Sequence, residues 1–376
     1  GPTGRRRRAL LGAALGVSVL LVALLGLALR SAEADWTLRE GAGSLPGRAT
    51  LTRGPYLQSV TTDSIVIVWD TERATDSRVN YGPAGGYGST AVDDGPGVGF
   101  GPAAADDGLT QDLEMSVRDP TPVAHHAVTL TGLLPYTEYG YQVSSGGTAL
   151  GPVSTFRTAA PATVKRFSFV AFGDTRTNAE AHQRVVDRIV ALAPEFVLHT
   201  GDLVASGSRA DQWDVFFDIE QDLIRQAPVF PVLGNHEGNH ANYFDAFHLP
   251  GNERWYAFDY GPARLIGLQV DGYASYAPGS AQYEWLKKKL RTNDSQWTMV
   301  FFHVPPYSSG PHADESYARG VRETLHPLFV RHGVSLVFNG HDHDYERSVV
   351  DGVTYVVAGA GGAPLYSRTN ENPHSV

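Results

Sequence analysis

The stretch Val334-Ser335-Leu336-Val337-Phe338-Asn339-Gly340-His341-Asp342-His343 decides the fold. It is a short apolar run, typical of a buried strand, that ends in side chains able to bind metal ions. Four other apolar runs end in a similar way, in Gly173-Asp174, Gly201-Asp202, Gly234-Asn235-His236-Glu237 and His303. In an open α/β sheet, ligands bind beyond the carboxyl ends of the strands. We therefore expect these five strand ends to form one crevice for metal ions.

Helical patterns separate these strands. Apolar residues recur with a helical period in residues 178–193, 280–290 and 316–332. Strands that alternate with helices indicate a layered α/β domain, which we place at residues 165–376. Because the sequence stops soon after the loop Gly359-Ala360-Gly361-Gly362, we expect this domain to lack its closing strands.

An all-β domain is predicted ahead of it, at residues 53–160. Residues 64–69, 127–130 and 139–143 read as strands, because they are rich in β-branched and aromatic side chains. Tyr139 lies where a tyrosine corner would hydrogen-bond across a sandwich turn, so the segment resembles a fibronectin type III module. Residues 82–122 are rich in Gly, Asp and Pro and are predicted to form a long loop.

The N-terminal residues predict export. Arg5 to Arg8 precede an uncharged apolar run at residues 9–29. As a helix this run would be about 31 Å long, enough to cross a bilayer. Ala32-Glu33-Ala34 offers a cleavage site, so residues 1–34 fit either a signal peptide or a membrane anchor, followed by a linker at residues 35–52. Both interpretations predict an exported protein, extracellular, on the cell surface or in the periplasm.

Composition excludes some functions. The formal net charge of −10 argues against a nucleic-acid-binding protein, which would carry a basic face. The chain contains no cysteine, so disulfides and thiolate metal sites are excluded. Histidine, carboxylate and amide side chains remain as metal ligands.

The strand ends supply enough ligands for two metal ions. Two divalent ions held close together can clamp a phosphoryl group and supply hydroxide at neutral pH. One carboxylate must bridge them, and we assign this role to Asp202. Asp174 and His343 would complete the shell of the first ion. The remaining ligands, for the second ion, are Asn235, His303 and His341.

His236 directly follows a proposed ligand. It would therefore lie beside the metal ions without binding one. Because an imidazole titrates near neutral pH, His236 is a candidate general acid for the leaving-group oxygen.

Together these motifs resemble those of the calcineurin-like metallophosphoesterases. The segment Gly340 to Arg347, Gly-His-Asp-His-Asp-Tyr-Glu-Arg, is especially similar to purple acid phosphatases, which also carry a β-sandwich ahead of the catalytic domain. The resemblance covers roughly residues 53–364. It implies the metallophosphoesterase fold, a four-layer α/β sandwich, with a dinuclear site that hydrolyses phosphate esters. It also implies that His312 contacts the substrate phosphate.

Two positions depart from this pattern. Ala205 stands where purple acid phosphatases have a metal-binding tyrosine, so the metal pair, from Fe, Zn or Mn, is left open. Arg176 stands where the broader superfamily often has a metal-binding histidine. A guanidinium cannot ligate a metal but can pair with a phosphate, which makes Arg176 a candidate substrate contact. The first ion would then have only three protein ligands.

The sequence thus predicts a metal-dependent phosphatase that hydrolyses small phosphate monoesters by attack of metal-bound hydroxide. A phosphodiesterase or nucleotidase is the alternative within the same class. Because Arg176 and Ala205 depart from the pattern, a surface binding or adhesion protein with a degenerate metal site is the alternative from another class.

Overall fold

The computed structural model describes residues 49–84, 113 and 115–376. The predicted signal or anchor at residues 1–34, most of the predicted linker and much of the predicted loop at residues 82–122 lie outside this part. Within the described residues, no helix is both long enough and apolar enough to span a membrane.

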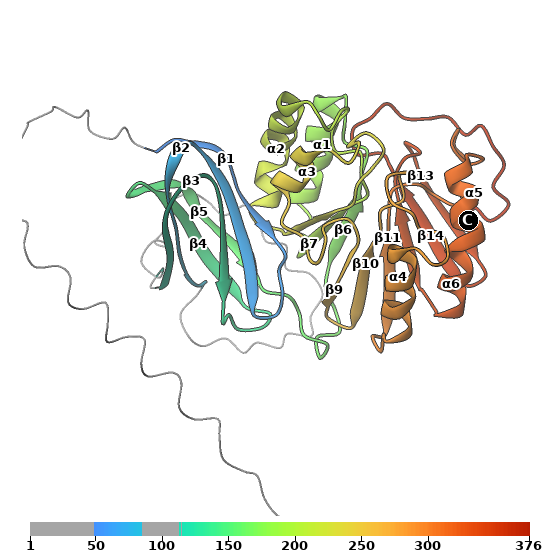
Figure 1. Cartoon of the computed structure of the whole chain (residues 1–376), viewed down its shortest axis with the longest axis horizontal. Coiled ribbons are helices and arrows are strands. Elements are labelled where there is room, and N and C mark those ends of the chain that lie inside the picture. The colour runs from blue at the N-terminus through green and yellow to red at the C-terminus, as the bar shows by residue number, and fades with distance from the viewer. Residues whose placement is uncertain (1–48, 85–112, 114) are drawn as a thin grey trace, which may run out of the picture. The chain divides into compact units, whose positions relative to one another are not determined.

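The first five strands form one antiparallel sheet (Figure 1). They are β1 (Leu51–Gln58), β2 (Ser64–Pro83), β3 (Met115–Thr131), β4 (Glu138–Ser145) and β5 (Thr148–Arg157). The long strand β2 pairs with β1, β3 and β4. The Tyr139 hydroxyl accepts a hydrogen bond from the Leu134 amide at 2.9 Å, as the predicted tyrosine corner requires.

The loop prediction is wrong for residues 82–83, which end β2, and for residues 115–122, which belong to β3. The polar, Pro-containing sequence of residues 115–122 does not have a strand pattern. They are extended because the second half of β2 offers them a backbone partner, from Tyr81 opposite Met115 to Thr75 opposite Val123. Pairing between distant segments overrides local preference here.

The following α/β domain contains two sheets. The smaller is parallel, in the order β6 (Phe169–Phe172), β7 (Phe196–His199), β8 (Val229–Pro231). The larger has the order β13-β14-β12-β11-β10-β9. Its members are β9 (Tyr256–Tyr260), β10 (Ala263–Gly267), β11 (Trp297–Phe301), β12 (Leu336–Asn339), β13 (Tyr345–Val350) and β14 (Val353–Ala358). Strands β10, β11, β12 and β14 run parallel, and the edge strands β9 and β13 are antiparallel.

Aromatic side chains pack the two sheets against each other. The ring of Phe230 in β8 stacks on that of Phe258 in β9 with 3.8 Å between centroids. Phe169 in β6 meets Phe338 in β12 edge-on at 5.7 Å. These contacts make the space between the sheets a dry core rather than a cleft.

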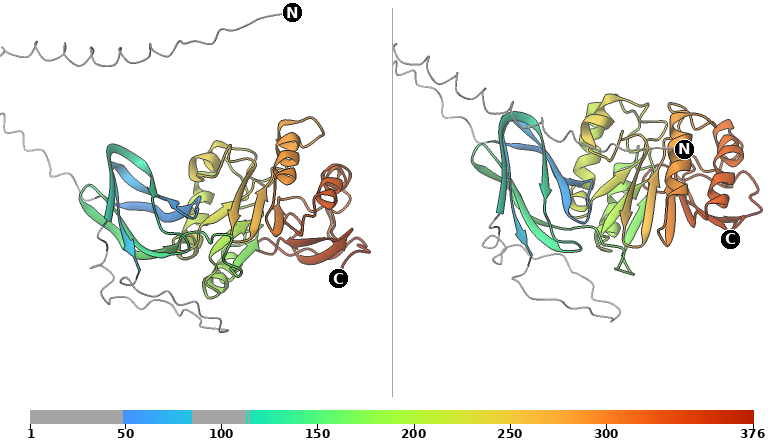
Figure 2. Two further views of the ribbon diagram at one scale, coloured as in Figure 1. Left: turned by 90° about the horizontal axis from the view of Figure 1, so that it is seen from below. Right: turned by 60° about the horizontal axis from the view of Figure 1, so that its bottom comes forward.

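Helices cover the outer faces of both sheets, which gives the predicted four layers (Figures 1 and 2). Beside the smaller sheet lie α1 (Ala179–Val190), α2 (Ala210–Ile224) and α3 (Ala241–Ala246). Beside the larger lie α4 (Ala281–Arg291), α5 (Ser316–Thr324) and α6 (His326–Arg331). The single helix predicted at residues 316–332 is divided at Leu325, because Pro327 has no backbone N–H and favours a new helix start.

The N-terminal sheet is joined to the α/β domain by polar contacts, and the described residues from 49 to 376 belong to one compact unit. The buried Tyr56 hydroxyl of β1 donates to the Ala246 carbonyl of α3 at 2.7 Å. The Tyr141 hydroxyl of β4 donates to the Arg225 carbonyl after α2 at 2.8 Å.

Candidate metal centre

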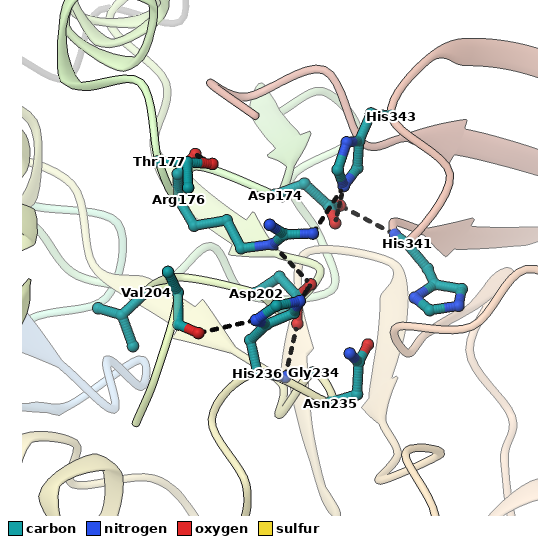
Figure 3. Close-up of polar contacts among 12 residues, drawn as sticks. Asp174, Arg176, Thr177, Asp202, Val204, Gly234, Asn235, His236, His341 and His343 are labelled. Atoms are coloured by element: carbon teal, nitrogen blue, oxygen red, sulfur yellow. Dashed lines mark hydrogen bonds and ion pairs between the residues drawn. The ribbon is translucent and has the colours of Figure 1, made fainter. Parts of the chain in front are cut away.

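The residues that follow β6, β7, β8, β11 and β12 meet at one place, as the spacing of the motifs predicts. Figure 3 labels those that follow β6, β7, β8 and β12. Three of the predicted ligands there have a left-handed backbone conformation, with φ of 58° at Asp174, 56° at Asp202 and 68° at His341. This conformation is unfavourable for a residue with a Cβ atom and concentrates at functional sites. The fold accepts local strain in order to aim these side chains inward.

Three of the predicted ligands surround the Nε2 atom of a fourth, His303, and we call these four residues the asparagine subsite. The distances from His303 Nε2 are 3.0 Å to Asn235 Oδ1, 3.1 Å to His341 Nδ1 and 3.3 Å to Asp202 Oδ1. His303 and Asp202 are almost completely buried. One carboxylate oxygen, one amide oxygen and two ring nitrogens on a common point form a donor set suited to a first-row divalent ion.

The hydrogen bonds of the two histidines leave the right atoms free for a metal. His303 Nδ1 donates to the Thr200 carbonyl at 2.9 Å, so Nε2 is the atom that can bind a metal when it gives up its proton. His341 Nε2 lies 3.3 Å from Glu315 Oε2, which favours the proton on Nε2 and the lone pair on Nδ1. Burial and the neighbouring histidines lower the pKa of His341 to about 2, so its ring is neutral, as a ligand must be.

The two oxygens of Asp202 face different neighbours. Its Oδ1 accepts from the His236 amide at 3.1 Å, and its Oδ2 accepts from Arg176 Nε at 3.2 Å. Burial alone would raise the pKa of Asp202, but its contact with the protonated His303 ring holds it below its usual range. The same contact raises the pKa of His303 to about 10, and a bound metal ion would take the place of that proton. Asp202 is therefore ionised and central, which fits the predicted bridging role.

The other predicted ligands, Asp174 and His343, lie beside Asp202 together with Arg176, and we call these three residues the arginine subsite. His343 Nε2 is 3.5 Å from Asp174 Oδ1 and 3.2 Å from Arg176 Nη2. Asp174 Oδ2 accepts from the His341 amide at 2.9 Å, whereas its buried Oδ1 has no hydrogen-bond partner among the described residues. Burial raises the pKa of Asp174 well above its usual value. An orphaned buried carboxylate oxygen needs a cation nearby.

The three predicted substrate-side residues are all at the rim of this centre. His236 donates from Nδ1 to the Ala205 carbonyl at 2.8 Å, and its Nε2 is 3.8 Å from Asp202 Oδ2. The His312 ring lies 4.2 Å from that of His341 and its Nδ1 is 2.7 Å from Glu315 Oε1. The Arg176 side chain is 14% exposed and points inward (Figure 3).

Two glutamates support the centre without having been assigned a role from the sequence. Glu237 is fully buried, and its carboxylate accepts hydrogen bonds from the backbone amides of Gly234, Asp202, Leu203 and Val204. It therefore ties the loop after β7 to the loop after β8. Its position directly after His236 in the motif was the one feature of the sequence that could have indicated this role. Glu315 bridges His312 and His341, and nothing in the spacing of the motifs indicated that contact.

Comparison with known proteins agrees with this architecture. The family described as calcineurin-like phosphoesterase matches residues 167–345, and the purple acid phosphatase N-terminal domain matches residues 54–158. An uncharacterized protein of Mycobacterium tuberculosis is 30% identical over 91% of this chain and 70% of its own length. A probable purple acid phosphatase of Arabidopsis thaliana is 29% identical over 58% of this chain and 54% of its own length. Human acid phosphatase type 7 is 30% identical over 59% of this chain and 56% of its own length.

Solved structures share the fold. A purple acid phosphatase from yellow lupin seeds superposes with a TM-score of 0.68 at 20% identity, over 86% of this chain and 67% of that one. The chain belongs to the calcineurin-like metallophosphoesterases, with the N-terminal domain of purple acid phosphatases, and is a phosphoric ester hydrolase. Membership implies a metal centre and a small phosphate-ester substrate.

Proposed function

We propose that this protein is a metal-dependent phosphatase that hydrolyses phosphate monoesters. The observation that carries the proposal is the convergence of Asp202, Asn235 and His341 on His303 Nε2 within 3.3 Å. A divalent ion bound there would supply a nucleophile at neutral pH and polarise the phosphoryl group.

The residues that would hold metal ions are Asp202, Asn235, His303 and His341 of the asparagine subsite and Asp174 and His343 of the arginine subsite. The family implies a dinuclear centre, with Asp202 as the shared carboxylate. The close backbone packing supports metal binding, since a Cβ atom on Gly234 would lie 2.2 Å from Asp202 Oδ1 and one on Gly340 would lie 2.3 Å from Asp174 Oδ2. Only glycine lets the two loops approach the carboxylates this closely.

His236 is proposed to donate a proton to the leaving-group oxygen. Because its Nδ1–H is fixed on the Ala205 carbonyl, its Nε2 atom is the one that can exchange a proton with the substrate. The ring is 30% exposed, so both solvent and substrate can reach it.

His312 and Arg176 are proposed to contact the phosphate. The Glu315 carboxylate beside Nδ1 orients the His312 ring, which leaves Nε2 for a phosphate oxygen. Arg176 has five N–H donors, of which those on Asp202 and His343 use only part. Its remaining donors would pair with a phosphate oxygen.

For the molecule as a whole, we propose export through residues 1–34, a linker at 35–52, a fibronectin type III-like domain at 53–160 and a catalytic domain at 165–376. The charge-then-apolar order of the first residues supports export. The sheet of β1–β5 and the two-sheet α/β domain support the division.

The test is hydrolysis of p-nitrophenyl phosphate by the purified full chain before and after chelation, alongside the variant Asp202→Ala. We expect chelator-sensitive turnover that the variant lacks. Turnover that survives both treatments would refute the proposal. A higher rate on bis(p-nitrophenyl) phosphate than on the monoester would favour the phosphodiesterase alternative. Absence of turnover with any of Mn, Zn or Fe would favour the binding-protein alternative.

A further inference from the structure

Arg176 reaches into the place that the first metal ion would occupy. It lies two residues after Asp174, and its guanidinium spans from Asp202 Oδ2, 3.2 Å from Nε, to His343 Nε2, 3.2 Å from Nη2 (Figure 3). Asp202 and His343 are two of the three ligands predicted for that ion. The third, Asp174, has its unpaired Oδ1 atom 3.5 Å from the same His343 nitrogen.

The contact with His343 uses the only atom with which that side chain could bind a metal from this position. His343 Nδ1 is 2.8 Å from the Pro364 carbonyl, and a carbonyl can only accept, so Nδ1 carries the proton. The lone pair is therefore on Nε2, where it accepts from the arginine. The Tyr366 ring stacks on that of His343 with 3.9 Å between centroids and 17° between planes, which restricts rotation of the imidazole.

The backbone beside Arg176 is shaped to place its side chain. Asp174 and Thr177 flank it with φ of 58° and 73°, and Thr177 is a β-branched residue for which this conformation is especially unfavourable. The side chain is 14% exposed, although arginine is rarely buried without ionic partners. Strained neighbours and a largely buried guanidinium indicate a fixed position rather than a solvent-facing rotamer.

The asparagine subsite differs in this respect. Among the residues the structure describes, no lysine or arginine hydrogen-bonds to Asp202 Oδ1, Asn235 Oδ1, His303 Nε2 or His341 Nδ1. Its donor atoms lie within 3.3 Å of His303 Nε2. The two subsites thus offer similar ligands, but among the described residues a guanidinium lies only in the arginine subsite.

We propose that the guanidinium of Arg176 takes the place of the first metal ion, so that the centre holds one ion, in the asparagine subsite. This inference rests on the proposed function, since it concerns the same site. The ionised Asp202 and the unpaired Oδ1 atom of Asp174 are both buried, and a positive charge beside them would stabilise both. A guanidinium stays protonated at any working pH and supplies that charge permanently. It can also donate N–H hydrogen bonds to the phosphate oxygens, which a metal ion in the same place would bind by coordination.

Metal counting on the purified full chain tests the proposal. The protein is stripped with a chelator, incubated with excess Mn²⁺, freed of unbound ion, and assayed for bound metal and by electron paramagnetic resonance. We expect about one ion per chain with the spectrum of an isolated ion. Two tightly bound ions with the spectrum of a spin-coupled pair, or no bound ion, would overturn the proposal.

A substitution sharpens the result. Arg176→His replaces the guanidinium by a ligand, so this variant is expected to bind about two ions and to show the spin-coupled spectrum. Arg184→Ala, which removes an exposed arginine of α1, is the matched control and should still bind about one ion. If Arg176→His folds and still binds a single ion while the wild type does too, another feature limits the count and the proposal is wrong.

The count also separates this proposal from the proposed function, because it does not depend on turnover. One ion without phosphate-ester hydrolysis would refute the function and leave the role of Arg176 standing. Hydrolysis by a protein that binds two ions would support the function and refute the proposed role of Arg176. The wild-type count decides the matter even if Arg176→His fails to fold.

Discussion

His341 and His343 lie two residues apart on the same loop and have opposite surroundings. His341 turns its Nδ1 atom toward His303 Nε2, 3.1 Å away, whereas His343 turns its Nε2 lone pair toward the guanidinium of Arg176. The comparison teaches that a histidine in a metal motif can bind an ion only if no other cationic group occupies the place beside its free ring nitrogen. A motif that matches a family in sequence can still differ from it in the number of ions it holds.

The largest effect is expected in the asparagine subsite. His303→Ala should reduce kcat/KM for p-nitrophenyl phosphate by about 1000-fold or more, because the imidazole on which the other ligands converge is lost. Bound metal should fall in parallel. Arg184→Ala serves as the control, and a His303→Ala enzyme with more than about a tenth of wild-type kcat/KM would break the distinction between the subsites.

Substituting the two loop histidines separately compares the subsites directly. His341→Ala should cost about 100-fold or more in kcat/KM, since it removes a proposed ligand. His343→Ala should lower kcat/KM by about 10-fold or less. The partner of His343 is Arg176, which still forms its ion pair with Asp202 when the imidazole is removed. Equal losses, measured under saturating metal, would mean that His343 also binds an ion.

His236 lies near Asp202 Oδ2, the oxygen atom that also accepts from Arg176. If it protonates the leaving group, His236→Ala should lower kcat by about 100-fold for phenyl phosphate. The loss should be much smaller for p-nitrophenyl phosphate, whose leaving group needs little protonation. Similar losses on both substrates would assign His236 to orienting Asp202 rather than to proton transfer.

The smallest effect is expected far from both subsites. Tyr56→Phe leaves the buried Ala246 carbonyl without its donor and should destabilise the fold by about 1 kcal/mol, a fall in Tm of about 1–2 °C. Calorimetry would record the change in Tm, while kcat/KM should stay at the wild-type value. A marked loss of kcat/KM would show that the N-terminal sheet positions the metal centre.

Much of the site could be predicted because its residues follow short apolar runs. Each run that ends in Gly-Asp, Gly-Asn-His or Gly-His was expected to be a strand, and parallel strands bring such ends to one edge. The tyrosine corner at Tyr139 was predicted for a similar reason, since its partner at Leu134 is close in sequence.

The rest depended on contacts between distant segments. Spacing along the chain does not show that Arg176 meets His343, because that contact follows from the order of strands in two different sheets. The pairing of residues 115–122 with β2 has the same origin. The end of α5 before Pro327, by contrast, was signalled in the sequence, since proline restricts the helix around it.

The central claim is that the asparagine subsite binds the ion on which hydrolysis depends. The most direct measurement is a titration of Mn²⁺ into the chelated full chain, recording bound metal and p-nitrophenyl phosphate hydrolysis together. We predict that turnover rises in proportion to the first equivalent of bound ion and then stays constant. Turnover in the chelated protein, or ion binding with no turnover at any metal concentration, would contradict the account.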